Sequence, residues 1–352
     1  MKDDILKIIK DGTYAPSGEN CQPWRFHVDG NKILIFNLPE ADQSLYNSQQ
    51  KGSYTAHGAL IENIVISAKE HGYAAGVVLF PDENDEDLVS VITLTATEKT
   101  HDPLYEVIPK RHTNRKEYSG EKLSIAQKKE LIDSVASLGF GRLELVDDEN
   151  NLQILGAALS VNERVLFENK YIHNFFYDHI LWDEKDKNKA RGFYIKTLEF
   201  LPHQLKAVKL FKNWFVLSLL NTILGVSKMI SKENADKYAK SGTLGLVVAN
   251  GSSKHDYVNA GRALQRVWLT GTKLGLAMHP CTGSIYFMEQ IRDNGGKEFS
   301  PFHQALIKKS YADSMEAFMV KDVATPMLFR IGFAGEATAR STRLEPIITY
   351  AS

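Results

Sequence analysis

A short segment about a third of the way along the chain gathers side chains that could bind phosphate. It reads Pro109-Lys110-Arg111-His112-Thr113-Asn114-Arg115. The guanidinium forks of Arg111 and Arg115 match phosphate oxygens, and the hydroxyl of Thr113 and backbone N–H groups can supply further donors. A solvated basic linker between two elements is the alternative interpretation of this segment when it is taken alone.

A second polar segment lies near the N-terminus and reads Ala15-Pro16-Ser17-Gly18-Glu19-Asn20-Cys21-Gln22-Pro23-Trp24-Arg25-Phe26. It follows an expected helix and precedes an expected strand. A polar turn accounts for the proline and the glycine. It does not account for Ser17, Asn20 and Gln22 together, which offer both donors and acceptors to a bound ligand.

Composition indicates a soluble globular protein with room for two domains or one large one. The chain has 352 residues, of which 43% are apolar and 24% charged, and a formal net charge of −1. This balance gives no general attraction to nucleic acid or to an anionic membrane, so any basic site must be local. The first residues have no apolar signal-peptide core. The two cysteines, Cys21 and Cys281, fit a reducing compartment, and we expect a cytoplasmic protein.

The order of helical and strand patterns predicts an α+β fold. Apolar periodicity predicts helices over 3–11, 54–71, 124–138, 149–167 and 257–274. Strands are expected over 24–28, 32–36, 75–80, 89–95, 142–146, 244–249, 277–281 and 327–333. Asp29-Gly30-Asn31 is a good hairpin turn between the first two strands.

Residues 170–237 are rich in aromatic residues and lysines and show no strand pattern, which predicts a helical insertion. The run over 213–227 carries no charge. It is shorter than the roughly 20 apolar residues of a membrane span and contains two asparagines. We therefore expect a buried or lid-like helix rather than membrane contact. Trp214 and Phe215 are interpreted as core, with a substrate wall as the alternative.

Two long helices show an internal repeat. Gly58-Ala59-Leu60 in the first corresponds to Gly261-Arg262-Ala263-Leu264 in the second. Fourteen residues after the first glycine of each comes another glycine, Gly72 or Gly275, and then a short strand. The pattern predicts a duplicated α+β unit, whose two copies could pack as a pseudo-dimer within one chain.

The polar N-terminal segment resembles the flavin-contacting loop of the nitroreductase family, the FMN-dependent NAD(P)H oxidoreductases. The family pattern is roughly Ala/Ser-Pro-Ser-x-x-Asn-x-Gln-Pro-Trp-x-Phe, and every signature position is present. Arg111-His112-Thr113 resembles the family's Arg-x-Ser element, which binds the FMN phosphate. Pro280-Cys281-Thr282-Gly283 resembles its Pro-x-x-Gly loop, whose backbone passes the isoalloxazine ring near N5. Arg340-Ser341-Thr342-Arg343-Leu344 resembles its C-terminal basic pair.

These elements are distributed unusually along the chain. The part over 1–104 has the flavin loop but no Arg-x-Ser element, whereas the part over 105–352 has the phosphate elements and no flavin loop. Each FMN of the homodimeric family lies between two subunits. The resemblance therefore implies two nitroreductase-like halves, 1–104 and 105–352, that pack as an intramolecular pseudo-dimer with one complete FMN site and one dead site. This arrangement is similar to that of the tandem single-chain subgroup that includes the Acg-type proteins.

The resemblance implies an FMN site drawn from all four elements: Pro16, Ser17, Asn20, Gln22, Arg111, His112, Thr113, Arg115, Pro280, Thr282, Gly283, Arg340 and Arg343. The flavin carries the redox chemistry, so no catalytic side chain is assigned. Lys240 is a possible partner for the N1–C2=O end of the flavin. We expect Arg111→Ala to weaken FMN binding much more than a change at Arg191, which lies in the insertion.

The activity that the resemblance implies is ping-pong electron transfer from NADH or NADPH through FMN to a nitroaromatic, a quinone or a similar small-molecule acceptor. A protein that stores or sequesters FMN beneath a closed insertion is the alternative function. No nucleic-acid partner is expected, and no further oligomer is required.

Other chemical signals in the chain are weaker. His173 and His179 do not share a helix face as a His-x-x-x-His pair would, so we expect packing roles and no metal site. No nucleophile-elbow motif is present, and no Gly-x-Gly-x-x-Gly follows an expected strand.

Overall fold

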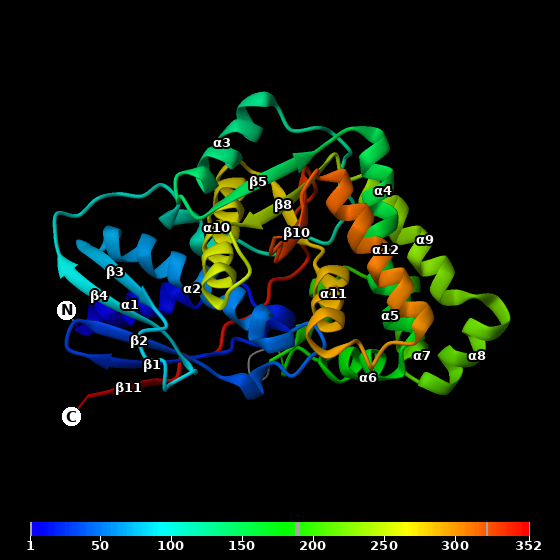
Figure 1. Ribbon diagram of the computed structural model, residues 1–352, viewed down its shortest axis with the longest axis horizontal. Coiled ribbons are helices and arrows are strands. Elements are labelled where there is room, and N and C mark those ends of the chain that lie inside the picture. The colour runs from blue at the N-terminus through cyan, green and yellow to red at the C-terminus, as the bar shows by residue number, and fades with distance from the viewer. Residues whose placement is uncertain (1, 187–190, 322, 352) are drawn as a thin grey trace.

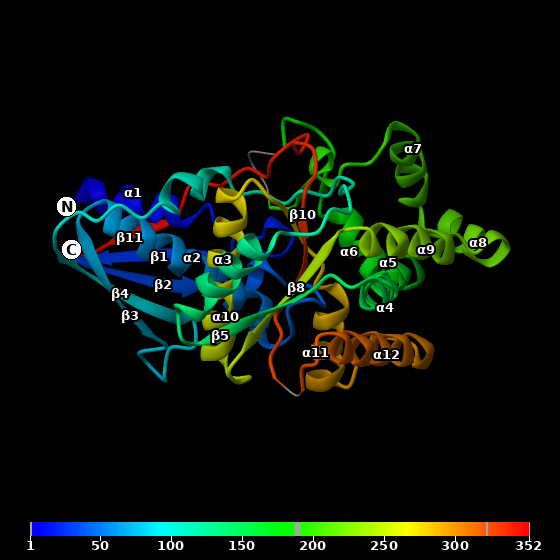
Figure 2. The same ribbon diagram turned by 90° about the horizontal axis from the view of Figure 1, so that it is seen from above.

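The computed structural model describes residues 2–186, 191–321 and 323–351. Helices and strands are mixed along the chain, and the strands form two larger sheets that lie on either side of a central pair of long helices (Figure 1). A group of helices occupies the end of the molecule opposite the two termini (Figures 1 and 2). The α+β class expected from the sequence is confirmed.

The first sheet has five strands in the order β11-β1-β2-β4-β3. Gly30, which has a φ of 57°, lies in the two-residue turn between β1 and β2 and supplies the left-handed conformation that such hairpins need. Ile33 and Ile35 face helices α1 (Lys2–Gly12) and α2 (Lys51–Glu70) in one apolar core. The strands are β1 (Trp24–Asp29), β2 (Lys32–Asn37), β3 (Tyr73–Leu79), β4 (Leu88–Ala96) and β11 (Ile348–Tyr350).

The last strand returns the chain to its beginning. β11 pairs in parallel with β1, and Phe26 lies opposite Ile348. The sequence analysis did not identify this strand, because three residues with one apolar side chain give no periodic signal. Its pairing places the segment that precedes it, including Arg340 and Arg343, beside the N-terminal loop. The division of the chain at residues 104 and 105 stays a prediction.

The second sheet has four strands and is covered by helices on both faces. Its order is β5-β8-β10-β9, with antiparallel neighbours. The central strand β8 is buried along its whole length. Its Val247 and Ala249 face one apolar core with α10, whereas Leu244 and Leu246 face another. The strands are β5 (Gly141–Val146), β8 (Thr243–Ala249), β9 (Ala277–Pro280) and β10 (Met327–Gly332).

Helices α2 and α10 (Lys254–Lys273) cross at the two glycines of the internal repeat. A Cβ atom on Gly58 would overlap the carbonyl oxygen of Val258, and one on Gly261 would overlap that of Thr55. Only glycine allows two helix backbones to approach so closely. The two glycines that correspond in the internal repeat, Gly58 and Gly261, are therefore in direct contact.

Buried polar contacts fix the same helix pair beyond the glycine crossing. The carboxylate of Glu62 is fully buried and forms ion pairs with Arg262 and Arg266 of α10, at 3.0 and 2.6 Å. One position further along α2, Asn63 Oδ1 accepts a hydrogen bond of 2.7 Å from Gln265. Because a buried carboxylate needs such partners, these contacts favour one register of the two helices.

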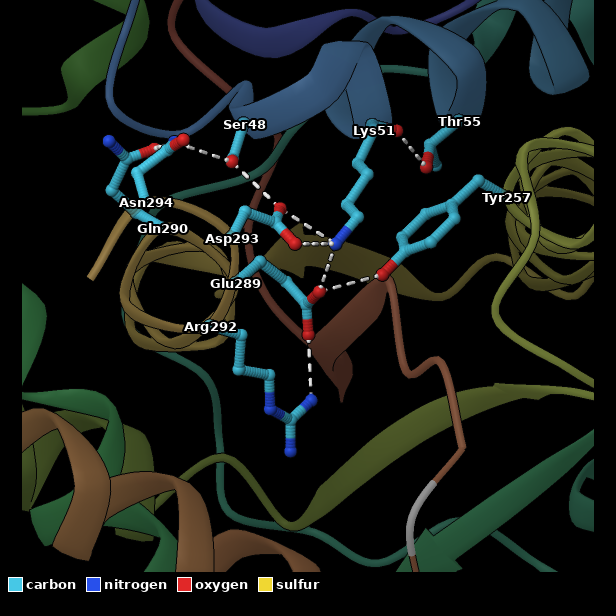
Figure 3. Close-up of polar contacts among 9 residues, drawn as sticks. All are labelled: Ser48, Lys51, Thr55, Tyr257, Glu289, Gln290, Arg292, Asp293 and Asn294. Atoms are coloured by element: carbon cyan, nitrogen blue, oxygen red, sulfur yellow. Dashed lines mark hydrogen bonds and ion pairs between the residues drawn. The ribbon is translucent and has the colours of Figure 1, made fainter. Parts of the chain in front are cut away.

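A further network joins the start of α2 to α11 (Gly283–Asn294), as Figure 3 shows. Lys51 Nζ lies between the carboxylates of Glu289 and Asp293, at 2.6 and 2.8 Å. Glu289 also accepts a hydrogen bond from Tyr257 of α10 and pairs with Arg292. Two cations and two carboxylates balance in charge, so the group can be buried as a structural link between the helices.

The remaining helices pack against the second sheet or form the distal helical group. Helix α3 starts at the N-cap Ser124, as predicted. The helix expected over 149–167 is interrupted at Ser160 and forms α4 and α5, and α11 and α12 had not been foreseen. The bounds are α3 (Ile125–Ala136), α4 (Glu149–Leu159), α5 (Val161–Glu168), α6 (Lys170–Asp178), α7 (Pro202–Phe211), α8 (Trp214–Leu224), α9 (Val226–Ala239) and α12 (Pro301–Ala317).

The segment expected as a helical insertion contains α6 to α9 and, against expectation, two short strands. β6 (Ile180–Leu181) and β7 (Phe193–Tyr194) pair in parallel. The uncharged run was expected to be buried or lid-like, and one face of α8 is not buried: Phe215, which was interpreted as core, is 76% exposed. Within the described ranges no single helix is long and apolar enough to span a membrane. Helices α7 and α8 taken together have the length and composition of a membrane span, but the pair is bent by 108°.

Candidate functional site

A cavity of about 430 Å³ is lined by four segments that are far apart in the sequence, and three of them carry the residues predicted for the site. These three are the loop after α1, the basic segment that follows the short 3-10 helix over Tyr105–Lys110, and the chain before β11. Nine residues predicted for the site line it: Pro16, Ser17, Asn20, Arg111, His112, Thr113, Arg115, Arg340 and Arg343. The linker interpretation of the basic segment is therefore wrong.

Arg111 is the most enclosed cation of the cavity. Its side chain is buried, and its guanidinium lies 4.3 Å from the ring centroid of Trp268 on α10. One nitrogen, Nη2, donates to the carbonyl oxygen of Tyr14 at 3.0 Å. Stacking on the indole and this single bond hold the guanidinium plane against the cavity wall.

Arg343 reaches the same carbonyl from the other end of the chain. Its Nη2 donates to Tyr14 O at 3.0 Å, and its Nη1 donates to Asn20 Oδ1 at 2.9 Å. Burial lowers the pKa of Arg343 to about 10, and burial followed by the charge of Arg343 lowers the pKa of Arg111. Because guanidinium groups stay charged in proteins, these directions mean that two like charges are held close together at a cost.

Several N–H groups of these arginines have no acceptor. Arg111 Nε, Arg111 Nη1 and Arg343 Nε are buried without a hydrogen-bond partner among the described residues. No ion pair joins either arginine to a carboxylate in the described part of the chain. A buried, unpaired guanidinium is strongly unfavourable unless a ligand supplies the missing acceptors. An anion with several oxygens, such as a phosphate monoester, fits this donor set.

Arg115 and Arg340 extend the basic lining. Arg115 donates to the carbonyl of Thr197 at 2.9 Å and lies 5.5 Å from the ring centroid of Phe193. Burial lowers its pKa to about 10. Arg340 is exposed and contacts the carbonyl of Pro109 at 3.4 Å. The cavity wall thus carries the buried Arg111 and the half-buried Arg115 and Arg343, and the exposed Arg340 is a solvated cation in the same lining.

The N-terminal loop holds an uncommon backbone shape beside these cations. Glu19, Asn20 and Gln22 have φ values of 48°, 58° and 48°, in the left-handed region that residues with a Cβ seldom adopt. Such strain persists only where surrounding contacts over-determine it, and it concentrates at functional sites. A simple chain reversal does not require this backbone conformation, so the loop is a candidate functional element.

Contacts with the C-terminal segment maintain that shape. Gln22, which was predicted to face the ligand, is buried and does not line the cavity; its Oε1 accepts a hydrogen bond of 3.0 Å from Leu344 N. Its own N–H donates to Ser17 Oγ at 2.9 Å, and Asn20 Nδ2 donates to Thr342 O at 3.2 Å. Gln22 thus fastens the loop to the segment that carries Arg343.

Two carboxylic acids, Glu19 of the loop and Asp42, lie close enough to influence each other. Burial, followed by the charge of Asp42, raises the pKa of Glu19, and burial raises the pKa of Asp42. His179 Nδ1 approaches Glu19 at 4.0 Å. Neither acid is among the residues that line the cavity.

The predicted residues Pro280, Thr282 and Gly283 are not among the residues that line the cavity. They form the end of β9 and the start of α11. A Cβ on Gly283 would overlap the side chain of Asn162, so the backbone is pressed against α5 at this point. Their role toward a ligand stays a prediction.

The segment expected as an insertion supplies lining residues that the sequence analysis missed. Phe193 of β7 and Thr197 line the cavity, as does Tyr14 of the N-terminal loop. Arg191, expected to lie away from the site, donates from Nε to the carbonyl of Cys21 at 2.6 Å. Because it supports the loop directly, Arg191 is not a neutral comparison for Arg111.

The lysine suggested from the sequence is also misplaced. Lys240 is exposed and does not line the cavity. Lys237, about one turn earlier on α9, donates to the carbonyl of Arg115 at 2.8 Å, and burial lowers its pKa. No periodic signal distinguishes the two lysines, because the choice depends on how α9 packs.

No cluster of three or more His, Cys, Asp or Glu side chains that could hold a metal ion occurs among the described residues. His173 is buried, with its ring 5.1 Å from that of Trp214 and its Nε2 2.8 Å from Phe211 O. These contacts describe a packing role in the distal helical group.

Comparisons with known proteins give distant similarities, and no family model matches the chain. The chain is 23% identical over 334 residues, 94% of its length, to the uncharacterized protein MT1398 of Mycobacterium tuberculosis. It is 27% identical over 117 residues, 33% of its length, to the putative NAD(P)H nitroreductase MT3217 of the same organism. The chain covers 46% of the first relative and 34% of the second, so it spans less than half of either.

Among solved structures, the chain is similar to an FMN-bound nitroreductase from Bacteroides fragilis, with 10% identity and a TM-score of 0.36. The match covers 69% of this chain and 94% of that one. The resemblance to nitroreductases that the motifs indicated is also found in the sequence similarity to MT3217. The assignment to the tandem single-chain subgroup stays a prediction.

Proposed function

We propose that the chain is an FMN-dependent oxidoreductase that binds one FMN in the cavity between the N-terminal loop and the Arg111 segment. The observation that carries the proposal is the set of buried N–H groups on Arg111 and Arg343 that lack acceptors. The same two arginines line a cavity that is also lined by Ser17 and Asn20 of the flavin-loop motif. A basic wall and a polar loop of this kind suit a phosphate joined to a planar heterocycle.

The residues divide between the two ends of the cofactor. Arg111, Arg343 and the hydroxyl of Thr113 would hold the phosphate, with Arg340 at the rim. A hydrogen bond to a charged group contributes about 1.5–3 kcal/mol, so three such contacts supply much of the roughly 8 kcal/mol that micromolar binding requires. Ser17 and Asn20 would contact the ring edge. The flavin, when bound, supplies the electron transfer.

Two features support one site and a pseudo-dimeric arrangement. The repeat glycines Gly58 and Gly261 meet at the crossing of α2 and α10, as the two members of a duplicated unit would. The flavin loop occurs only in the first half, and the arginine segments occur only in the second. We infer that the halves complement each other and that the other possible site is inactive.

The proposed reaction is ping-pong electron transfer from NADH or NADPH to a nitroaromatic, a quinone or a similar acceptor. Arg115, which is half-buried in the lining, and Lys237, which bonds its backbone, place positive charge near one wall of the cavity. Such charge would stabilise the negative charge that develops on a flavin on reduction. No side chain is required as an acid or a base.

A second function, sequestration of FMN, is favoured by the covering segment. Phe193 and Thr197 line the cavity, and Arg191 donates a hydrogen bond to the carbonyl of Cys21 in the N-terminal loop. These contacts place the segment across part of the cavity, where it could exclude nicotinamide while leaving FMN bound.

Anaerobic rapid mixing of the FMN-loaded protein with NADH or NADPH distinguishes the two functions. Loss of flavin absorbance within seconds, followed by recovery on addition of a quinone, supports the oxidoreductase. A flavin that stays oxidised for minutes with both nucleotides, but is bleached by dithionite, supports sequestration. Phe193→Ala is the informative variant, because only an occluded site would gain reactivity from it.

A further inference from the structure

The helix α8 has two apolar faces, and only one of them is covered. Leu217 is fully buried, Trp214 packs against His173 of α6, and Asn221 donates to Phe167 O at 2.7 Å. At helical spacing on the other side, Phe215, Leu219 and Ile223 are 76%, 50% and 67% exposed. The outward face of α8 is therefore apolar and has no partner among the described residues.

Neighbouring positions enlarge this surface. Leu224 at the end of α8 and Met229 at the start of α9 are 61% and 65% exposed, and Leu210 near the end of α7 is 53% exposed. Seven of the seventeen exposed large apolar side chains of the described chain fall between residues 201 and 229. Scattered exposure is ordinary, but such clustering marks a contact surface. We call Leu210, Phe215, Leu219, Ile223, Leu224 and Met229 the apolar tip.

The charged residues over 200–232, the segment that carries the apolar tip, have one sign. Between Glu199 and Glu233 the chain contains no Asp or Glu and five lysines: Lys206, Lys209, Lys212, Lys228 and Lys232. All five are exposed, and none forms an ion pair among the described residues. The whole chain has a formal charge of −1, so this positive excess is local.

The apolar tip is separate from the cavity. Helix α8 lies at the end of the molecule opposite the N- and C-termini in both views (Figures 1 and 2). None of the residues that line the cavity belongs to α7, α8 or α9. Contact at the tip would therefore leave the cavity open.

We propose that the apolar tip is a docking surface for an anionic membrane, on which α8 lies parallel to the plane of the bilayer. An amphipathic helix with aromatic and aliphatic side chains flanked by lysines binds in this way. Anionic headgroups supply the charge that the five lysines complement. A symmetric contact between two copies would instead bring two sets of five lysines together, which is unfavourable.

Co-sedimentation of the full chain with vesicles tests this proposal. Vesicles of phosphatidylcholine with about one third phosphatidylglycerol are compared with vesicles of pure phosphatidylcholine. The chain is expected to sediment at least tenfold more with the anionic vesicles than with the neutral ones. About 0.5 M NaCl should release it, because salt at this concentration strongly screens charge interactions. Equal partitioning onto both vesicles, or onto neither, would overturn the proposal.

Matched variants locate the surface. Phe215→Ser with Ile223→Ser should lower partitioning about tenfold or more, and Lys212→Gln with Lys228→Gln should lower it by a similar factor. Met319→Ser, at a 91% exposed apolar position in another part of the fold, and Lys129→Gln, at an exposed lysine of α3, should leave partitioning unchanged. Loss of vesicle binding in the control variants would contradict the proposal. So would a chain that does not bind vesicles but forms a dimer, measured by sedimentation equilibrium, that depends on the apolar tip. Because the readout needs no flavin, it is independent of the redox function.

Discussion

Arg111 and Arg343 donate to the same acceptor, the carbonyl oxygen of Tyr14, each at 3.0 Å. The two arginines come from distant parts of the chain and approach each other because β11 pairs with β1. One carbonyl cannot neutralise two guanidinium groups, and three of their N–H groups remain without acceptors. These unsatisfied donors are the basis of the proposal that the pair binds an anion that the chain itself does not supply.

Replacing Arg343 should affect binding and stability in opposite directions. Arg343→Met keeps most of the side-chain volume but removes a charge that is buried beside Arg111. We expect FMN affinity to fall at least tenfold, because a charged hydrogen bond is lost. We expect the free energy of unfolding of the flavin-free protein to stay the same or to rise by about 1 kcal/mol.

Fluorescence titration of FMN and chemical denaturation of the same preparations measure the two effects. Arg142→Ala is the control, because Arg142 lies exposed on β5 and pairs only with Glu144. A fall in stability together with affinity would mean that Arg343 serves mainly to hold the loop in place, and would remove the basis for an anion site.

The crossing of α2 and α10 should not tolerate a methyl group. Gly261→Ala would press a Cβ against the carbonyl of Thr55, which belongs to a helix backbone and cannot move away easily. We expect a loss of about 2–3 kcal/mol in the free energy of unfolding, measured by urea denaturation. Gly271→Ala on the same helix is the control. Its nearest neighbour is the end of a flexible Ile331 side chain at 3.1 Å, so its effect should stay within about 1 kcal/mol.

The distal helical group should lose stability in acid through Glu168. Burial opposes ionisation of this carboxyl, but hydrogen bonds from His303, Ser227 and Arg164 outweigh it and lower its pKa to about 2. A carboxyl whose folded pKa lies below its unfolded value stabilises the fold above the unfolded value, near 4.5, and loses this contribution as the pH falls toward 2.

Glu168→Gln tests this dependence. At pH 6 the variant should be about 1–2 kcal/mol less stable than the unchanged protein, allowing for partial solvent screening. The difference should shrink steadily between pH 4.5 and pH 2 in denaturation curves. A difference that stays constant over this range would show that the charge of Glu168 does not contribute.

The polar segments of the site could be predicted from sequence because their residue types and spacing are specific. Ser17, Asn20, Arg111 and Arg343 all face one cavity, as the motifs implied. The same signal misassigned Gln22, which has the right type and position but turns inward to bond Leu344. Spacing places a residue on a loop, but packing decides which way its side chain points.

Contacts made by short or irregular segments could not be predicted. The three residues of β11 carry too little pattern to indicate a strand, although they determine where Arg343 lies. Arg191 looked remote because the chain around it lacks periodicity, yet it bonds Cys21 O. The exposure of Phe215 was missed for a related reason. A run that is apolar on every side predicts burial, but it does not indicate which face of the helix packs against the fold.

The central claim is that one FMN binds between the N-terminal loop and the two arginines, and a titration of the flavin-free protein with FMN tests it most directly. Calorimetry should give one FMN per chain, and Arg111→Ala should weaken binding at least tenfold while Arg142→Ala leaves it unchanged. Two equivalent FMN per chain, or full affinity in the Arg111→Ala protein, would contradict the account.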